Sequence, residues 1–293
     1  GEAVTVTCNL DVTSLSSVDE VNMQFDVGFF LRQSWVDKRA KHSADGPLIF
    51  REENVNSIWK PDTFLSNEKA GPSTLHLFPN DMMKVYPNGT IAYSMRVLQT
   101  LSCPMELTAF PFDRQKCDMK LESYSYEAHD LLLIWDEETP IDISDDLYLP
   151  QYNLIKFDVR TLCSKNYRNG IYECLRATFW LERLYGFYLL QDYIPSVFIV
   201  ILSWLSFWIS PEAVPARISL GVTTVLTMAT QLSGSKGSNP KVSYPKAIDI
   251  WLTACMTFVF ATMVEYAFVS SSIQRTFKAN RKEVTPFVQS QSL

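Results

Sequence analysis

Polar and apolar residues alternate along the first 183 residues, whereas residues 184–270 carry few charges and long apolar runs. The alternation is clearest at residues 4–7, 21–31 and 92–98. A period of two is typical of β-strands with one buried face. Turn-forming residues separate these segments at 45–47, 71–72 and 87–89. The pattern predicts an antiparallel β-sandwich over residues 1–183.

Three apolar runs follow, each long enough to cross a bilayer as a helix: residues 185–209, 215–234 and 247–269. They predict a transmembrane helical bundle over residues 184–270. The basic cluster at 275–282 marks a cytosolic end, so residues 271–293 are expected to begin a cytoplasmic segment. Three crossings then place residues 1–183 outside the cell.

The second apolar run carries a stripe of hydroxyl side chains. Ser219, Thr223, Leu226, Thr230 and Ser233 are spaced by four, three, four and three residues, which puts them on one helical face. A ring of such helices would line a water-filled pore. The alternative is a buried helix of a soluble protein, which the neighbouring apolar runs disfavour. The predicted pore segment is Pro215, Ala216, Arg217, Ser219, Thr223, Leu226, Thr230 and Ser233.

The composition narrows the possible functions. The net charge of −6 disfavours a nucleic-acid partner, and we find no nucleophile–base pair, metal-ligand spacing or phosphate loop that predicts an enzyme, a cofactor or a metal. Among the six cysteines, Cys103 with Cys117 and Cys163 with Cys174 form two close pairs, which indicate disulfides and an oxidising compartment. Asn88 begins a glycosylation sequon on a predicted turn, which suits an extracellular face.

The loop between Cys103 and Cys117 has an apolar tip at Phe110, Pro111 and Phe112. An ordinary stabilising disulfide would explain the cysteines but not the tip. We expect another part of the protein to bury it.

Several motifs together resemble one known family. They are residues 59–62 (WKPD), the Cys103–Cys117 loop, residues 194–196 (IPS), residues 215–217 (PAR) and residues 242–251 (VSYPKAIDIW). The chain resembles a subunit of the pentameric Cys-loop ligand-gated ion channels, in the anion-selective branch that contains glycine receptors and invertebrate glutamate-gated chloride channels. The resemblance covers nearly the whole chain. It also implies a fourth membrane helix, and no fourth apolar run occurs in these residues.

The resemblance implies a transmitter site between two subunits, covered by the Cys163–Cys174 hairpin as a flap. Aromatic side chains and Glu122 would hold an ammonium group, while Arg32 and Ser94 of a neighbouring subunit would hold a carboxylate. The implied ligand-binding residues are Phe30, Arg32, Phe64, Ser94, Glu122, Ser123, Tyr124, Tyr167, Asn169 and Tyr172.

The expected function is therefore that of a chloride channel subunit in the plasma membrane, with a synapse as one location, opened by an extracellular amino acid of the glycine or glutamate type. Its expected partners are four further subunits, the small amino-acid transmitter, chloride and membrane lipid. Two alternatives stay open: a channel gated by an amine such as histamine or by protons, and a truncated subunit that does not conduct.

Overall fold

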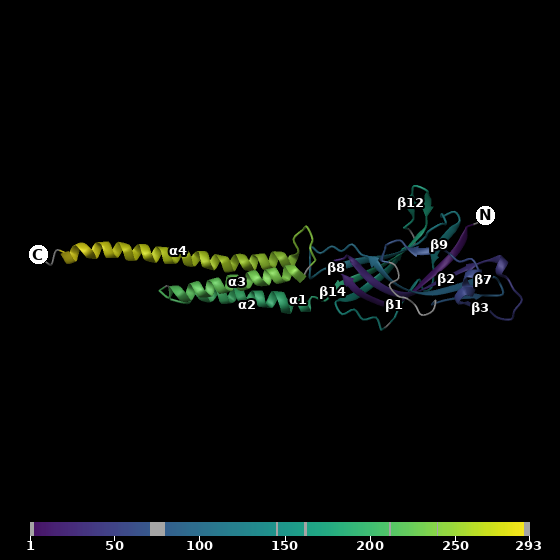
Figure 1. Cartoon of the computed structure of the whole chain (residues 1–293), viewed down its shortest axis with the longest axis horizontal. Coiled ribbons are helices and arrows are strands. Elements are labelled where there is room, and N and C mark those ends of the chain that lie inside the picture. Colours follow the sequence, from purple (N-terminus) through teal and green to yellow (C-terminus); the bar gives the residue numbers. More distant parts are fainter. Residues whose placement is uncertain are drawn as a thin grey trace. The chain divides into compact units, whose positions relative to one another are not determined.

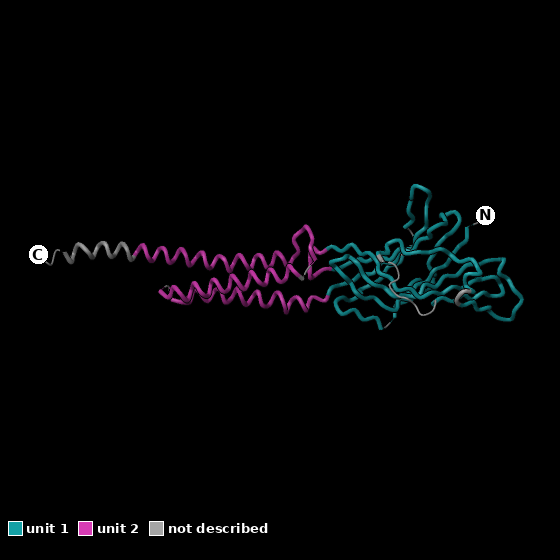
Figure 2. The backbone as a smooth tube through the Cα atoms, viewed as in Figure 1, with its two compact units in different colours: residues 1–106, 114–183 teal, residues 107–113, 184–293 magenta. Residues whose placement is uncertain are grey.

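The computed structural model describes residues 3–70, 80–144, 146–160, 163–210, 212–238 and 240–289. The chain divides into two compact units (Figure 2): residues 1–106 with 114–183, and residues 107–113 with 184–293. The turn predicted at 71–72 lies outside the described residues.

The first unit contains an eight-stranded sheet in the order β10–β1–β2–β7–β6–β3, in which β9 also pairs with β1 and β5 with β7. Figure 1 labels β1, β2, β3 and β7 of this sheet. Its strands are β1 (Val4–Asp19), β2 (Gln24–Val36), β3 (Leu48–Arg51), β5 (Glu68–Ala70), β6 (Asp81–Val85), β7 (Thr90–Ser102), β9 (Leu131–Trp135) and β10 (Ile141–Ile143). The pairings are antiparallel except that β9 and β10 run parallel to β1.

A four-stranded sheet in the order β11–β14–β8–β4 and a two-stranded hairpin, β12–β13, complete this unit. Their strands are β4 (Thr63–Leu65), β8 (Arg114–Ser123), β11 (Tyr152–Arg160), β12 (Lys165–Tyr167), β13 (Gly170–Tyr172) and β14 (Cys174–Arg183). The short helical segments η1 (Lys38–Ala40) and η2 (Glu52–Ser57) lie in loops. The predicted sandwich of antiparallel strands is confirmed.

Alternation along the strands decides which side chains enter the core. In β2, Phe25, Val27, Phe29 and Leu31 are buried, so the side chains between them point outward. From the smaller sheet, Met119, Leu121, Leu175 and Phe179 are buried in turn. The two predicted disulfides, Cys103–Cys117 and Cys163–Cys174, are present.

One predicted strand begins later than its hydrophobic pattern suggested. Residues 20–23 form a turn, so β2 starts at Gln24 rather than at Val21. The Asp19 carboxylate accepts hydrogen bonds from the backbone N–H groups of Val21 and Asn22, at 2.8 and 3.0 Å, and Met23 has a φ of 52°. A side chain that bonds the following backbone favours a turn over a strand.

The second unit contains the helices. They are α1 (Gly186–Tyr188), the π-helical segment η3 (Leu189–Tyr193), α2 (Ile194–Trp204), the 3₁₀ segment η4 (Leu205–Phe207), α3 (Val214–Ser238) and α4 (Ala247–Gln289). Among the described residues, two helical segments are long and apolar enough to cross a membrane: Gly186–Phe207 and Ala247–Thr276. The hydroxyl stripe makes α3 more polar than these two.

Two helix boundaries differ from the prediction. The first helical segment is composite, and its π-helical turn lies directly before Pro195, which has no backbone N–H to continue an α-helical pattern. The third run was expected to end near residue 269, but α4 continues to Gln289. The apolar run indicates only the membrane-crossing part of a helix, because polar residues propagate a helix equally well.

The helices pack closely along one side of α3. A Cβ atom on Gly221 would lie 1.9 Å from the Met263 sulfur, so only glycine allows this approach of α4 without a shift of Met263. Thr224 and Met228 are buried on the same side. Because α3 uses this side for packing, its other side is left exposed.

Candidate functional site

Four aromatic side chains and one carboxylate gather at the end of the smaller sheet. We call Phe64, Glu122, Tyr124, Tyr167 and Tyr172 the aromatic cluster. Phe64 on β4 lies opposite Glu122 on β8 in the strand register, and its ring centroid is 5.8 Å from that of Tyr124. The rings of Tyr167 and Tyr172 are 5.6 Å apart in an edge-to-face arrangement. An electron-rich aromatic wall beside a carboxylate is suited to an ammonium group.

The Glu122 carboxylate is buried and already paired. Its Oε1 lies 2.5 Å from the Lys165 Nζ, and its Oε2 accepts a hydrogen bond of 3.1 Å from the Tyr167 hydroxyl. Partial burial alone would lower the pKa of Lys165, but the hydrogen bonds with Glu122 and Tyr167 outweigh burial and raise the pKa above its ordinary value. The cluster therefore holds a lysine ammonium against its own carboxylate.

Ser123 and Asn169 make hydrogen bonds beside and within the cluster. The Ser123 hydroxyl donates to the Asp62 carboxylate at 2.6 Å, and the backbone N–H and hydroxyl of Ser125 donate to the same carboxylate at 2.7 and 2.5 Å. Burial acts to raise the pKa of Asp62, but these hydrogen bonds lower it below its ordinary value. The Asn169 amide donates to the Tyr172 hydroxyl at 3.0 Å.

The hairpin β12–β13 carries Tyr167 and Tyr172 over the end of β8. The Cys163–Cys174 disulfide closes its base beside Glu122, which pairs with Cys174 in the strand register. Its outer strand, β13, is held by a hydrogen bond of 2.8 Å from the Ala128 N–H to the Ile171 carbonyl. The hairpin is thus anchored at its base and outer strand.

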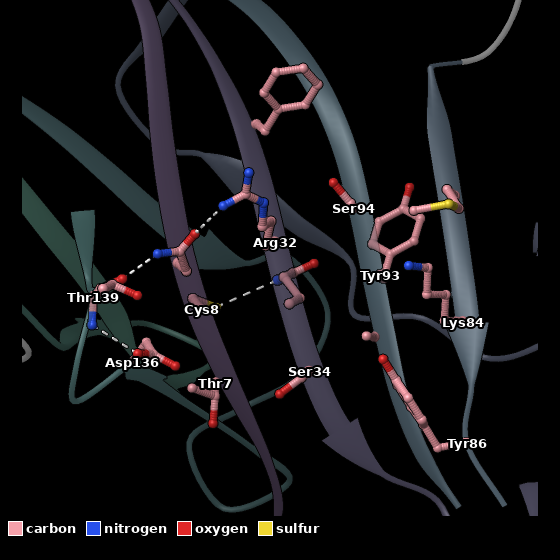
Figure 3. Close-up of a pocket in the computed structure, with 15 residues that line it drawn as sticks. Thr7, Cys8, Arg32, Ser34, Lys84, Tyr86, Tyr93, Ser94, Asp136 and Thr139 are labelled. Carbon is pink, nitrogen blue, oxygen red and sulfur yellow. Dashed lines mark hydrogen bonds between the residues drawn. The ribbon is translucent and has the colours of Figure 1, made fainter. Parts of the chain in front are cut away.

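Phe30, Arg32 and Ser94 form a second group, on the larger sheet. Phe30 and Arg32 lie on the outward face of β2, and Arg32 pairs with Ser94 of β7 in the register. They line a cavity of about 590 Å³ together with polar and aromatic side chains that include Lys84 and Tyr86 (Figure 3). This group and the aromatic cluster belong to different sheets.

Arg32 is already paired with a carboxylate in this group. Its Nη2 lies 2.6 Å from the Asp11 Oδ2, and its Nη1 donates to the Asn9 side-chain oxygen at 3.4 Å. Figure 3 shows this second bond running from β2 to β1. The guanidinium is half-exposed, so it remains accessible from solvent.

The stripe of α3 lies on its exposed side. Ser219, Thr223, Leu226, Thr230 and Ser233 are all exposed in the single chain. The hydroxyl groups of Thr223, Thr227 and Thr230 donate to carbonyls one turn earlier at 2.7–2.8 Å, so each hydroxyl oxygen can still accept a hydrogen bond. Leu226 is the one large apolar side chain of the stripe. Pro215 and Ala216 are exposed at the start of the helix.

Arg217 lies off this stripe. Its side chain is buried, and its Nε donates to the Ile209 carbonyl at 2.9 Å, while the guanidinium lies 5.9 Å from the Tyr266 ring centroid. The charge is near the beginning of α3, but it is held between helices rather than on the exposed face.

The tip of the Cys103–Cys117 loop belongs to the helical unit. Phe110 is fully buried, with its ring 4.9 Å from that of Tyr188, while Phe112 is half-exposed and contacts Tyr185 and Tyr193. The predicted burial of the tip is therefore complete for Phe110 and partial for Phe112.

The same tip satisfies the first backbone donors of α4. The Thr108 and Phe110 carbonyls accept from the N–H groups of Ala247 and Ile248 at 2.9 and 3.2 Å, and the Leu107 N–H donates to the Tyr244 hydroxyl at 2.9 Å. The first N–H groups of a helix have no acceptor within the helix, so the loop carbonyls supply the missing acceptors for α4. A shift of this loop would disturb the start of α4 directly.

Asn88 lies exposed in the turn between β6 and β7. Its side-chain oxygen accepts from the Thr90 N–H at 2.9 Å, and Gly89 follows with a φ of 90°. Such a turn presents the sequon to solvent.

Asp11 and Lys165 were not among the residues predicted from the sequence. Lys165 lies two positions before Tyr167, so a strand over this segment would have put both side chains on one face. The contact of Lys165 with Glu122 joins residues far apart in the chain, so it could be recognised only from the three-dimensional structure. The proximity of Asp11 to Arg32 depends on the register of β1 against β2, which the sequence alone does not show.

Comparison with protein families accounts for nearly the whole chain. Residues 1–185 match the model of the neurotransmitter-gated ion-channel ligand-binding domain, and residues 192–292 match that of the neurotransmitter-gated ion-channel transmembrane region. Proteins of this family are membrane channels rather than enzymes. They assemble as pentamers and bind small neurotransmitters in an extracellular domain. Since the two matches follow one another along this chain, it belongs to the family of neurotransmitter-gated ion channels.

Proposed function

We propose that this channel subunit forms an anion-selective pentamer that is opened by an extracellular amino acid. The observation that carries the proposal is the chemistry of the aromatic cluster and of the second group around Arg32. The aromatic cluster offers rings and a carboxylate, which suit an ammonium group, and the second group offers Arg32 and Ser94, which suit a carboxylate. An amino acid carries both charges.

The two groups act on one ligand when two copies of the chain meet. They belong to different sheets of the same unit, and a pentamer brings one face of each subunit against the other face of its neighbour. The aromatic cluster of one subunit and Arg32 of the next would then hold opposite ends of the ligand. Closure of the β12–β13 hairpin over the ligand would favour the open state through the extra contacts made there.

The proposed anion selectivity rests on the start of α3. If residues 1–183 lie outside the cell, α3 begins at the cytosolic end of the pore. A helix N-terminus carries about half a positive elementary charge. Pro215 and Ala216, exposed in the first turn of α3, bring no acidic group to the helix, and the nearest exposed carboxylate, Glu212, lies before its start. The buried Arg217 adds a positive charge behind them. A ring of such helix ends attracts anions.

The test of the ligand class is a set of concentration–response curves for glycine, glutamate, GABA and histamine, recorded from cells that express the chain. We expect an amino acid to open the channel. Arg32→Ala and Glu122→Gln should each raise its half-maximal concentration about tenfold or more, because a charge-assisted hydrogen bond contributes about 1.5–3 kcal/mol. Glu182→Gln is the matched control, since its carboxylate pairs with Arg114 at the other end of the β8–β14 ladder from Glu122. Wild-type curves in both site variants would refute the ligand site.

A second candidate is an amine-gated channel, and the Arg32–Asp11 contact favours it. Because Arg32 already has a carboxylate partner, a ligand without a carboxylate could use the aromatic cluster alone. The two candidates differ in one variant: Arg32→Ala weakens activation by an amino acid but leaves activation by histamine nearly unchanged.

A further inference from the structure

We propose that Asp11 determines which amino acids this channel accepts, by disfavouring ligands with a second carboxylate. The inference rests on the proposed function, because it concerns the same site. Asp11, on β1, would discriminate between two kinds of amino acid: zwitterions of zero net charge, such as glycine, and dicarboxylates of net negative charge, such as glutamate.

The strand register places Asp11 on the ligand face. In the antiparallel pair β1–β2, Asn9 lies opposite Arg32 and Asp11 opposite Phe30. Side chains two positions apart on a strand share one face, so the four side chains project together. Asp11 therefore lies diagonally from Arg32, in the arrangement that long side chains can bridge.

The contact occupies the group that a ligand carboxylate needs. The Arg32 Nη2 is 2.6 Å from the Asp11 Oδ2, and the Nη1 is 3.4 Å from the Asn9 side-chain oxygen. The fork of Arg32 thus faces two acceptors of its own chain. A ligand carboxylate must displace Asp11 or share the guanidinium with it, and in either case it comes close to a like charge.

The cost depends on the net charge of the ligand. A zwitterion brings an ammonium group that offsets the repulsion of its carboxylate by Asp11. A dicarboxylate brings one negative charge that nothing on the ligand offsets. The Asp11 side chain is only 22% exposed, so solvent screens this repulsion less than it would between two fully exposed groups.

Asp11 is suitable for a test because its pairing contributes little to folding. Arg32 is 51% exposed, and ion pairs at such sites contribute little to stability. Asp11→Asn preserves shape and removes the charge. Asp142→Asn is the matched control: Asp142 is the register partner of Asp11 on the neighbouring strand β10, whereas the contacts of Arg32 described above are with Asp11 and Asn9.

The experiment measures half-maximal concentrations of glycine and glutamate for the full-length wild-type channel, Asp11→Asn and Asp142→Asn. We expect Asp11→Asn to lower the value for glutamate about tenfold and the value for glycine about threefold or less, so that the glutamate-to-glycine ratio falls. Asp142→Asn should leave the ratio unchanged. An unchanged glutamate-to-glycine ratio in Asp11→Asn overturns the inference. An equal fall of the ratio in both variants also overturns it, because the ratio would then depend on the total negative charge of this part of the sheet rather than on the contact between Asp11 and Arg32.

A second measurement does not require the channel to open. The arginine reagent phenylglyoxal is applied to the purified full-length chain, and mass spectrometry follows its reaction with Arg32. Loss of the Asp11 charge should speed the reaction several-fold, and an unchanged rate overturns the pairing. A wild-type channel that ignores every ligand tested refutes the proposed function instead, so the two failures are distinguishable.

Discussion

At the scale of single residues, both charges offered to a ligand already have partners within the chain. Arg32 is 2.6 Å from Asp11, and Glu122 is 2.5 Å from Lys165. At the proposed site a ligand would exchange one ion pair for another, so the net gain in binding free energy would be smaller than the isolated contacts suggest. The affinity of such a site is set by the competing side chains as much as by the residues that touch the ligand.

Asp62 supports the cluster from behind, and its effect depends on pH. Its hydrogen bonds with Ser123 and Ser125 hold the pKa of the Asp62 carboxyl below its ordinary value. A group whose pKa is lowered by folding contributes stability above its unfolded pKa, about 3.9, and this contribution is lost as the pH falls through the folded value.

We expect Asp62→Asn to lower the thermal unfolding temperature of the full chain at pH 7, because the amide is a weaker acceptor for three hydrogen bonds. The difference from wild type should shrink when unfolding is measured near pH 3. An Asp62→Asn chain as stable as wild type at pH 7 would show that the three hydrogen bonds do not stabilise the fold.

At the scale of elements, the hydrophobic pattern predicted strands and helices better than their ends. Alternation located β1, β2 and β7, because one face of each is buried. The start of β2 was missed, since the Asp19 side chain stabilises a turn there. The end of α4 was missed because polar residues continue the helix beyond the apolar run.

We propose that Leu226, the large apolar side chain of the stripe on α3, closes the pore. A ring of leucines excludes water from a narrow passage without filling it. Leu226→Thr should wet the constriction and move the concentration–response curve to lower agonist concentrations, or produce a standing leak, in whole-cell recordings. Val225→Thr is the control, because Val225 directly precedes Leu226 and so points to a different face of α3. Equal effects of both changes would locate the closed gate elsewhere.

The tip of the Cys103–Cys117 loop is hydrogen-bonded to the segment that begins α4. Tyr244→Phe removes the acceptor for the Leu107 N–H and keeps the ring. An unpaired buried donor costs about 1–3 kcal/mol, so the variant should alter gating, with a clear shift in the half-maximal agonist concentration.

Ligand binding itself should be unchanged in Tyr244→Phe, as measured by the affinity of a competitive antagonist. Tyr185→Phe is the control, since Tyr185 contacts Phe112 through its ring. A normal curve in Tyr244→Phe would show that this bond does not take part in opening.

At the scale of the whole molecule, the order of a sandwich followed by helices could be predicted from the sequence. Apolar runs and strand alternation report burial, which is a local property of each residue type. The pairings of Lys165 with Glu122 and of Asp11 with Arg32 could not be predicted, because they depend on register and on strands distant in the chain. The interior position of Arg217 likewise required the packing of α3 against its neighbours.

A ligand-gated pore for anions makes the reversal potential of the agonist-evoked current depend on the chloride gradient. Replacement of most external chloride by a large impermeant anion should shift the wild-type reversal potential to positive voltages, as the chloride gradient requires. Ala216→Glu should move the reversal potential towards that of sodium and potassium, because it puts a carboxylate ring at the helix N-termini. A wild-type reversal potential that is insensitive to external chloride and follows sodium would show that the pore conducts cations rather than anions.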